Sequence, residues 1–400
     1  MMTNEATVTS KNNKFELPII DISPFVLTDV DDDDERKKQQ LEQRRIKVIK
    51  EWDDAFTNVG FVMIQGHGVP ETLIEKLRSK AKEFFEQTPL KEKISKYHRG
   101  PYGNYDGGYT PMGNETVSQS RTVGNNLGSD GGSGSSGGGS SGGGSGSDNG
   151  KNDDGTAAES TTATTGTIEA SKSKTLIKAA DLVESYILRP HQVHNDPPGL
   201  ANLGMEYRNH MKQLLSVLHE ISALSLGLDK DYFVPFYQDN ENQLSLRLGY
   251  YPECTKDTIL QPGTLRYGEH TDYTGFTILL QDDSDGDGGS DGTAAAGGGG
   301  GLEVKLPTGE FYAVQAIPNT FVVNIGDMFQ VWTNDKWKST VHRVAGPKGR
   351  CPSRLSIPFF TGPNDDAQIA PIVLQPGETA KHETITAGEH LRRKLQATQT

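Results

Sequence analysis

One stretch of sequence decides how the chain is interpreted: Gly268-Glu269-His270-Thr271-Asp272-Tyr273-Thr274-Gly275-Phe276-Thr277-Ile278-Leu279-Leu280. Its apolar second half, residues 276–280, predicts a buried strand. His270 and Asp272 stand two residues apart just before that strand, so in extended backbone their side chains project from one face. Polar pairs at strand ends are common, but an imidazole beside a carboxylate also supplies two ligands of a candidate metal site.

The third candidate ligand is His342, which lies in the strand-like run 339–344. Two histidines and one carboxylate on one side of an ion leave coordination positions open, as in the non-haem Fe(II) oxygenases. Ferrous iron needs these open positions because a co-substrate and dioxygen must both bind it. The three residues therefore favour an iron site.

Arg354 and Ser356 form a second pair of polar residues spaced two apart. A guanidinium holds a carboxylate through two parallel hydrogen bonds, and a neighbouring hydroxyl adds a third. A carboxylate-binding pair together with an iron site indicates a chelating keto acid whose far end carries a carboxylate.

Composition limits the classes of partner. The net charge of −13 and the pI near 5.3 argue against nucleic acid and anionic membranes. No apolar run approaches the ~20 residues that span a bilayer, and the first residues lack the apolar core of a signal peptide. We expect a cytoplasmic protein whose two cysteines, Cys254 and Cys351, are reduced thiols rather than a disulfide.

The distribution of glycine along the chain distinguishes the segments expected to fold from the low-complexity segments. More than half of the 46 glycines lie in residues 124–166 and 286–301, and the rest of the chain has an ordinary glycine content. Short strands with turn signals follow residue 243, which predicts a sandwich or barrel. The expected segments are a disordered tail (1–14), an N-terminal region (15–123), a Gly/Ser/Thr insertion (124–174), a helical region packing on the core (175–243), a β-rich core (244–372, with a Gly/Asp-rich insert at 283–301) and a C-terminal helix (373–400).

Several local features receive structural interpretations. His210 and His219 are expected at surface positions of a helix that ends at Gly227, and residues 107–111 are expected to form a turn near the mouth of the site. The last helix should begin at Thr386, which opens a capping box. The Asp-rich start of the second insert lacks the acidic twelfth residue of a calcium-binding loop, so we reject that function.

These motifs together resemble the isopenicillin N synthase-like group of Fe(II)/2-oxoglutarate-dependent dioxygenases. The resemblance implies an α+β fold, with a double-stranded β-helix (jelly roll) core flanked by helices from the N-terminal half. It rests on Leu17-Pro18-Ile19-Ile20-Asp21, Gly66-His67-Gly68-Val69-Pro70, His270-Thr271-Asp272, Asn324-Ile325-Gly326-Asp327, Ser339-Thr340-Val341-His342-Arg343 and Arg354-Leu355-Ser356.

The resemblance also assigns cofactors and roles. It implies Fe(II) bound by His270, Asp272 and His342, and ascorbate as a reductant. It implies 2-oxoglutarate as co-substrate, with its distal carboxylate on Arg354 and Ser356.

A tyrosine that assists co-substrate binding in relatives matches Tyr251. This chain has Gly249 where many relatives have Asn, so an accessory polar contact is expected to be missing.

The expected function is oxidation, by default hydroxylation, of a small organic molecule with release of succinate and CO2. An alternative is an oxidase of the same fold that does not use 2-oxoglutarate (isopenicillin N synthase-like or aminocyclopropane-carboxylate oxidase-like), with Arg354 and Ser356 binding the substrate's own carboxylate. A non-catalytic metal-binding or sensory protein is a further alternative, whereas a hydrolytic zinc site leaves the Arg–Ser pair without a purpose. Dioxygen and a small-molecule substrate are the expected partners, and neither the substrate's identity nor the oligomeric state follows from the sequence.

Overall fold

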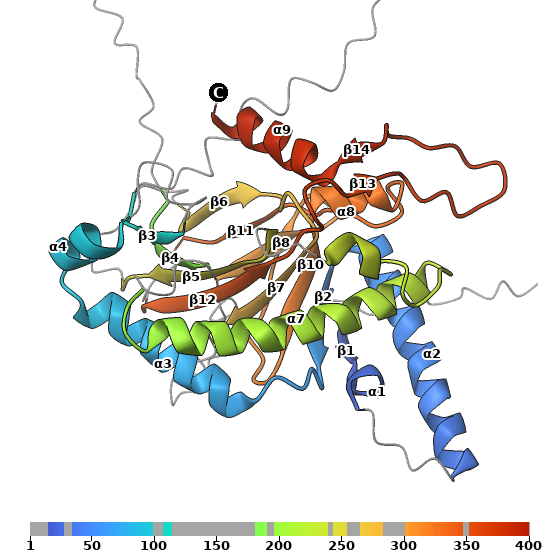
Figure 1. Ribbon diagram of the computed structural model, residues 1–400, viewed down its shortest axis with the longest axis horizontal. Coiled ribbons are helices and arrows are strands. Elements are labelled where there is room, and N and C mark those ends of the chain that lie inside the picture. Colours follow the sequence, from blue (N-terminus) through green and yellow to red (C-terminus); the bar gives the residue numbers. More distant parts are fainter. Residues whose placement is uncertain are drawn as a thin grey trace, which may run out of the picture.

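The computed structural model describes residues 15–27, 34–98, 107–113, 181–189, 196–238, 243–253, 265–282, 301–346 and 352–399 (Figure 1). The expected tail, the 124–174 insertion, nearly all of the Gly/Asp-rich insert and both cysteines lie outside these ranges. Within them, none of the helices combines the length and apolar character needed to cross a bilayer.

The larger of two main sheets joins strands from both halves of the chain. Its neighbouring strands are antiparallel, except that β1 and β2 run parallel. In sheet order the eight strands are β1 (Ile19–Asp21), β2 (Phe61–Gln65), β10 (Phe321–Ile325), β7 (Phe276–Gln281), β12 (Arg354–Phe360), β5 (Ser245–Tyr251), β4 (Glu184–Leu188) and β3 (Gly108–Thr110).

A second, four-stranded sheet completes the jelly roll. Its strands, in order, are β6 (Tyr267–His270), β11 (His342–Val344), β8 (Leu302–Lys305) and β9 (Phe311–Ala313). Because side chains alternate along a strand, each strand of the large sheet has one face toward the helices and the other toward the jelly-roll interior. On β5 the residues Leu246, Leu248 and Tyr250 belong to the main hydrophobic core, so residues 247, 249 and 251 take the interior face.

Three long helices cover the outer face of the large sheet. They are α2 (Glu35–Asn58), α3 (Glu71–Gln87) and α7 (Leu200–Ser225), and α7 packs against both of the others (Figure 1). Asp34 caps α2 by accepting hydrogen bonds from the backbone N–H groups of Arg36 and Lys37. Helix α7 ends before Gly227, whose φ of 71° is the left-handed conformation that ends many helices, as the sequence predicted.

Short elements connect these layers. They are α1 (Ser23–Val26), α4 (Leu90–Glu92), the π-helix η1 (Lys93–Tyr97), the 3-10 helix η4 (Val234–Tyr237), α8 (Asp327–Trp332), β13 (Gln368–Ile369), β14 (Ile385–Thr386) and α9 (Ala387–Gln399).

The structure corrects three local predictions. The C-terminal helix occupies only Ala387–Gln399 rather than 373–400, although Thr386 Oγ1 does accept the Glu389 N–H at 3.2 Å as a cap. His219 is buried, not at the surface, because α7 lies between the sheet and other helices and has more than one buried face. Residues 108–110 form edge strand β3 instead of a turn, because they pair with β4.

Candidate metal centre

Two histidines face each other across the small sheet. His270 ends β6 and is paired in register with His342, the first residue of β11, and their ring centroids lie 4.2 Å apart. In each residue Nδ1 lies within hydrogen-bond distance of the backbone carbonyl two residues earlier: 2.8 Å to Gly268 O and 3.1 Å to Thr340 O. When Nδ1–H donates to that carbonyl, the Nε2 lone pair is left to bind a metal.

Asp272 lies in the loop between β6 and β7, and its two oxygens have different surroundings. Oδ2 accepts hydrogen bonds from Thr277 Oγ1 and Asn324 Nδ2, both at 2.6 Å. Thr277 and Asn324 are register partners on β7 and β10, so together they fix the carboxylate to the large sheet. Oδ1 lies 3.8 Å from Nε2 of His270 and 3.9 Å from Nε2 of His342.

The electrostatics favour the protonation states that a metal requires. Burial, reinforced by the neighbouring His342, lowers the pKa of His270 to about 3, so its imidazole is neutral at neutral pH. Burial alone would raise the pKa of Asp272, but the two histidines and the hydrogen bonds from Asn324 and Thr277 outweigh it and lower that pKa. Neutral imidazole and ionised carboxylate are the forms that bind metal ions.

These three side chains present ligand atoms that all lie within 4.8 Å of one another. Two imidazole nitrogens and one carboxylate oxygen form the facial donor set that suits Fe(II) with further positions open to other ligands. The structure thus brings together all three ligands predicted from the sequence.

Arg354 and Ser356 lie on β12, and both side chains are buried. Nε and Nη1 of Arg354 are buried and find no hydrogen-bond partner among the described residues. Burial lowers the pKa of Arg354, and nearby Tyr251 and Asp282 oppose that shift. Buried guanidinium donors without protein acceptors are costly unless a ligand accepts from them, so the arrangement fits an incoming carboxylate.

Tyr251 and Gly249 stand opposite the Arg–Ser pair on the neighbouring strand. The register pairs Arg354 with Tyr251 and Ser356 with Gly249. The Tyr251 ring centroid lies 5.1 Å from Arg354 Cζ. The structure therefore brings the predicted tyrosine to the guanidinium.

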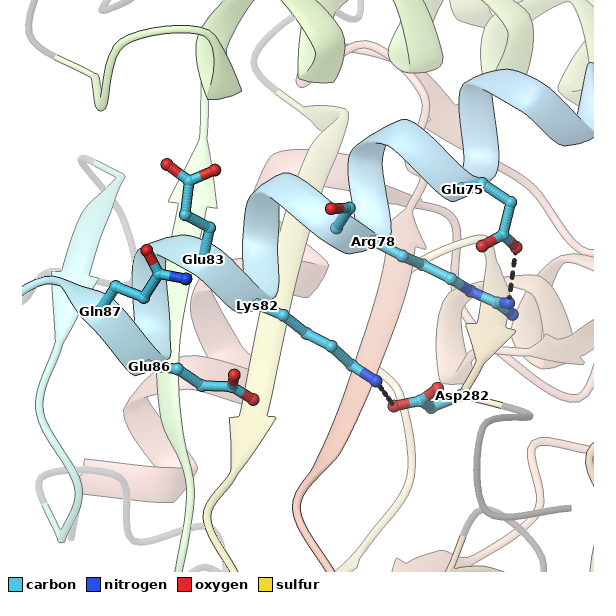
Figure 2. Close-up of a pocket in the computed structure, with 8 residues that line it drawn as sticks. Glu75, Arg78, Lys82, Glu83, Glu86, Gln87 and Asp282 are labelled. Atoms are coloured by element: carbon cyan, nitrogen blue, oxygen red, sulfur yellow. Dashed lines mark hydrogen bonds and ion pairs between the residues drawn. The ribbon is translucent and has the colours of Figure 1, made fainter. Parts of the chain in front are cut away.

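A polar cleft of about 540 Å³ runs along α3, lined by Glu75, Arg78, Ser79, Lys82, Glu83, Glu86, Gln87 and Asp282. Figure 2 shows that both of its cationic side chains are paired with carboxylates: Lys82 Nζ lies 3.0 Å from Asp282, and Arg78 lies 3.1 Å from Glu75. Asp282 also accepts the Leu355 N–H at 3.0 Å. The cleft contains neither the triad nor the Arg–Ser pair, and we interpret it as support for the strand that carries Arg354.

Sequence reasoning missed the residues that orient the triad. Thr277 and Asn324 are polar residues within buried strands, and that was the available signal, but their convergence on Asp272 depends on pairing between distant strands. The sequence also provided no sign that α9 contacts the loop between β6 and β7, which carries Asp272, and the start of α8. His390 Nε2 lies 3.1 Å from the Tyr273 carbonyl, and Lys394 Nζ lies 2.7 Å from Asp327.

Comparison with known proteins gives a consistent result. Residues 242–363 match the 2OG-Fe(II) oxygenase superfamily, and residues 17–127 match the N-terminal region of non-haem dioxygenases described from morphine synthesis. Homoarginine-6-hydroxylase 2-ODD-233 of Oryza sativa subsp. japonica is 29% identical over 385 residues, covering 95% of this chain and 96% of that protein. The 2-oxoglutarate-Fe(II) type oxidoreductase ppzC of Metarhizium rileyi is 28% identical, covering 95% and 87%.

Solved structures show the same fold. Full-length Neurospora crassa T7H in complex with alpha-KG and thymine superposes with a TM-score of 0.65 at 26% identity, covering 97% of this chain and 98% of that one. A putative 2OG-Fe(II) oxygenase family protein from Caulobacter crescentus, at 22% identity and a TM-score of 0.61, covers 95% and 98% and supports the fold alone. These matches confirm the predicted α+β jelly roll.

Proposed function

This chain belongs to the 2OG-Fe(II) oxygenase superfamily and is a 2-oxoglutarate- and Fe(II)-dependent oxidoreductase, and we propose that His270, Asp272 and His342 bind its iron. We further propose that it hydroxylates a small organic molecule. When bound, iron and 2-oxoglutarate supply an oxidation by dioxygen that is coupled to release of succinate and CO2.

The protein's own contribution begins with holding the ligands in their binding forms. The carbonyls of Gly268 and Thr340 fix the ring orientation of the two histidines, which keeps both Nε2 atoms directed at one point. Thr277 and Asn324 occupy only Oδ2 of Asp272, so Oδ1 remains for the metal.

Arg354 and Ser356 orient the co-substrate in this proposal. The buried guanidinium has N–H groups on Nε and Nη1 that are free among the described residues and lie on its two different edges, so either edge can offer an unsatisfied donor to the distal carboxylate, and Ser356 adds its hydroxyl. Exclusion of water from this interior strengthens those hydrogen bonds and protects the oxidising site from side reactions. The observation that carries the proposal is the presence, in one jelly-roll interior, of a complete triad and a buried arginine with unsatisfied donors.

A substrate screen tests the function. The full-length protein is supplied with Fe(II), ascorbate and 2-oxoglutarate, and succinate is measured for each candidate molecule. We expect substrate-dependent succinate together with a product that is heavier by one oxygen atom. Substrate-dependent oxygen uptake that needs no 2-oxoglutarate would instead identify the oxidase alternative.

His270→Ala separates the metal role from the fold. We expect loss of turnover and a fall in Fe(II) affinity, with thermal stability of the metal-free protein nearly unchanged, because the core does not depend on this imidazole. His67→Ala is the control, since His67 Nδ1 accepts the Val69 N–H inside a loop and serves structure. Full turnover by His270→Ala would contradict the assignment.

A further inference from the structure

A second arginine lies inside the jelly roll on the same strand face as Gly249 and Tyr251. Arg247 is buried, with 7% of its surface exposed, and alternation along β5 turns it to the interior. Because Ser356 is the register partner of Gly249, Arg247 stands one step beyond the Arg–Ser pair along the sheet.

Gly249 makes room for this guanidinium. A Cβ at position 249 would lie 3.1 Å from Arg247 Nη1 and 3.3 Å from Ser356 Oγ. The φ of Gly249 is outside the left-handed region, so the glycine is explained by space and not by backbone conformation. The guanidinium therefore reaches back over Gly249 toward Ser356.

Tyr267 holds the other side of this arginine and connects it to the metal centre. Arg247 Cζ lies 5.2 Å from the Tyr267 ring centroid, a cation–π contact. The same tyrosine ring meets the His270 ring edge-on, with centroids 4.9 Å apart.

We infer that Arg247 binds a carboxylate of the primary substrate, so that this enzyme acts on anionic small molecules. The inference rests on the proposed function, which already accounts for both ends of 2-oxoglutarate: the metal takes one end, and Arg354 with Ser356 takes the other. Arg247 is a buried cationic group in addition to the metal and Arg354, and it therefore matches an anionic group on the remaining ligand, the primary substrate. A guanidinium suits this task because it has five N–H donors and can hold a carboxylate while keeping its protein contacts.

The test compares carboxylic acids with their methyl esters. The probes are hexanoate, phenylacetate, indole-3-acetate and N-acetyl-phenylalanine, each paired with its ester. Binding to the full chain is measured by calorimetry with redox-inactive Mn(II) and 2-oxoglutarate present. We expect at least one acid to bind about tenfold or more tightly than its ester, as hydrogen bonds to a charged group imply.

Three variants locate the preference. Arg247→Met should bring the acid-to-ester affinity ratio close to one, and Arg247→Lys should leave an intermediate ratio. Gly249→Ala should lower the ratio while keeping the charge, because the added carbon displaces the guanidinium. Arg45→Met is the matched control and should keep the wild-type ratio, since Arg45 also lies 5.2 Å from an aromatic ring, that of Phe25, on a distant helix.

Either of two results would overturn the inference. One is a wild-type protein that prefers no acid of the panel. The other is an Arg247→Met protein that keeps the ratio or that loses 2-oxoglutarate affinity alone, which would assign Arg247 to the fold or to the co-substrate. Failure of the proposed function is distinct, because it would appear as absence of succinate under every condition.

Discussion

Arg354 is a residue whose side-chain shape matters as much as its charge. Its guanidinium is fully enclosed, with Nε and Nη1 unsatisfied by the described protein. Arg354→Lys keeps the charge but cannot present two parallel donors. We expect the KM for 2-oxoglutarate to rise on the order of tenfold or more, with a smaller change in kcat.

The measurement is succinate formation against 2-oxoglutarate concentration under saturating Fe(II). Arg343→Lys provides a control, because Arg343 is next to His342 in sequence but pairs with Glu269 and Glu303 instead. An unchanged KM in Arg354→Lys would mean that the co-substrate's carboxylate binds elsewhere.

At this scale the sequence identified the candidate metal ligands and the candidate carboxylate-binding pair, but not the residues that hold them in place. The triad and the Arg–Ser pair have recognisable spacings within short motifs. Asn324 and Thr277 reach Asp272 only through the register of β10 on β7, which no local pattern encodes. Arg247 was missed for a similar reason, since its role depends on the empty space at Gly249.

At the scale of elements, one buried ion cluster joins η1 to the edge of the large sheet. Lys93 Nζ donates to Glu184 at 2.7 Å and to the Phe85 carbonyl at 2.9 Å. Tyr109, on β3, donates to the same Glu184 oxygen at 2.5 Å. The negative charge of Glu184 is thereby balanced by Lys93 inside the protein, and its carboxylate is hydrogen-bonded.

Removing the lysine should leave a buried carboxylate without its countercharge. We expect Lys93→Met to lower the free energy of unfolding by about 3–5 kcal/mol, measured by urea denaturation at pH 7. Lys96→Met is the control from the same helical turn: its 2.8 Å pair with Glu92 is exposed, so its removal should have little effect. Equal stabilities of the two variants would show that Glu184 is solvated.

Whether a segment forms a helix or a strand was easier to predict from the sequence than which of its side chains are buried. The apolar run 276–280 became β7, and the period of α7 was recognised, because both signals are local. The burial of His219 was mispredicted because a helix covered on several sides has no reliable polar face. Its ring instead lies among aromatics, 4.1 Å from the Tyr237 ring.

For the whole molecule, buried His219 makes stability depend on pH. Burial lowers the pKa of His219 from 6.5 to about 3. Between pH 6.5 and pH 3, His219 is therefore protonated in the unfolded chain but neutral in the folded protein. Stability from this group is fully present above pH 6.5 and is lost as the pH falls below it. One pH unit below 6.5 costs about 1.4 kcal/mol.

His219→Phe should remove this dependence. We expect the loss of unfolding free energy between pH 7.5 and 5.5 to be about 1.4 kcal/mol smaller in the variant than in the wild type, by urea denaturation. The other histidines are common to both proteins and cancel in the difference. If the unfolding free energies of the two proteins changed in parallel between pH 7.5 and 5.5, His219 would be taking up a proton in the folded protein as readily as in the unfolded chain.

The pairing of β3 with β4 has a consequence for how this protein can vary. Thr110 and Ser185 are register partners, so the two ends of everything encoded between them are fastened side by side in the sheet. Closing a longer loop between fixed ends costs little additional free energy. Residues 114–180 of that interval can therefore be shortened, lengthened or exchanged for a reporter domain, provided that Asp181, which accepts the Gly268 N–H, and Glu184 are kept, while the geometry of the candidate metal centre stays as it is.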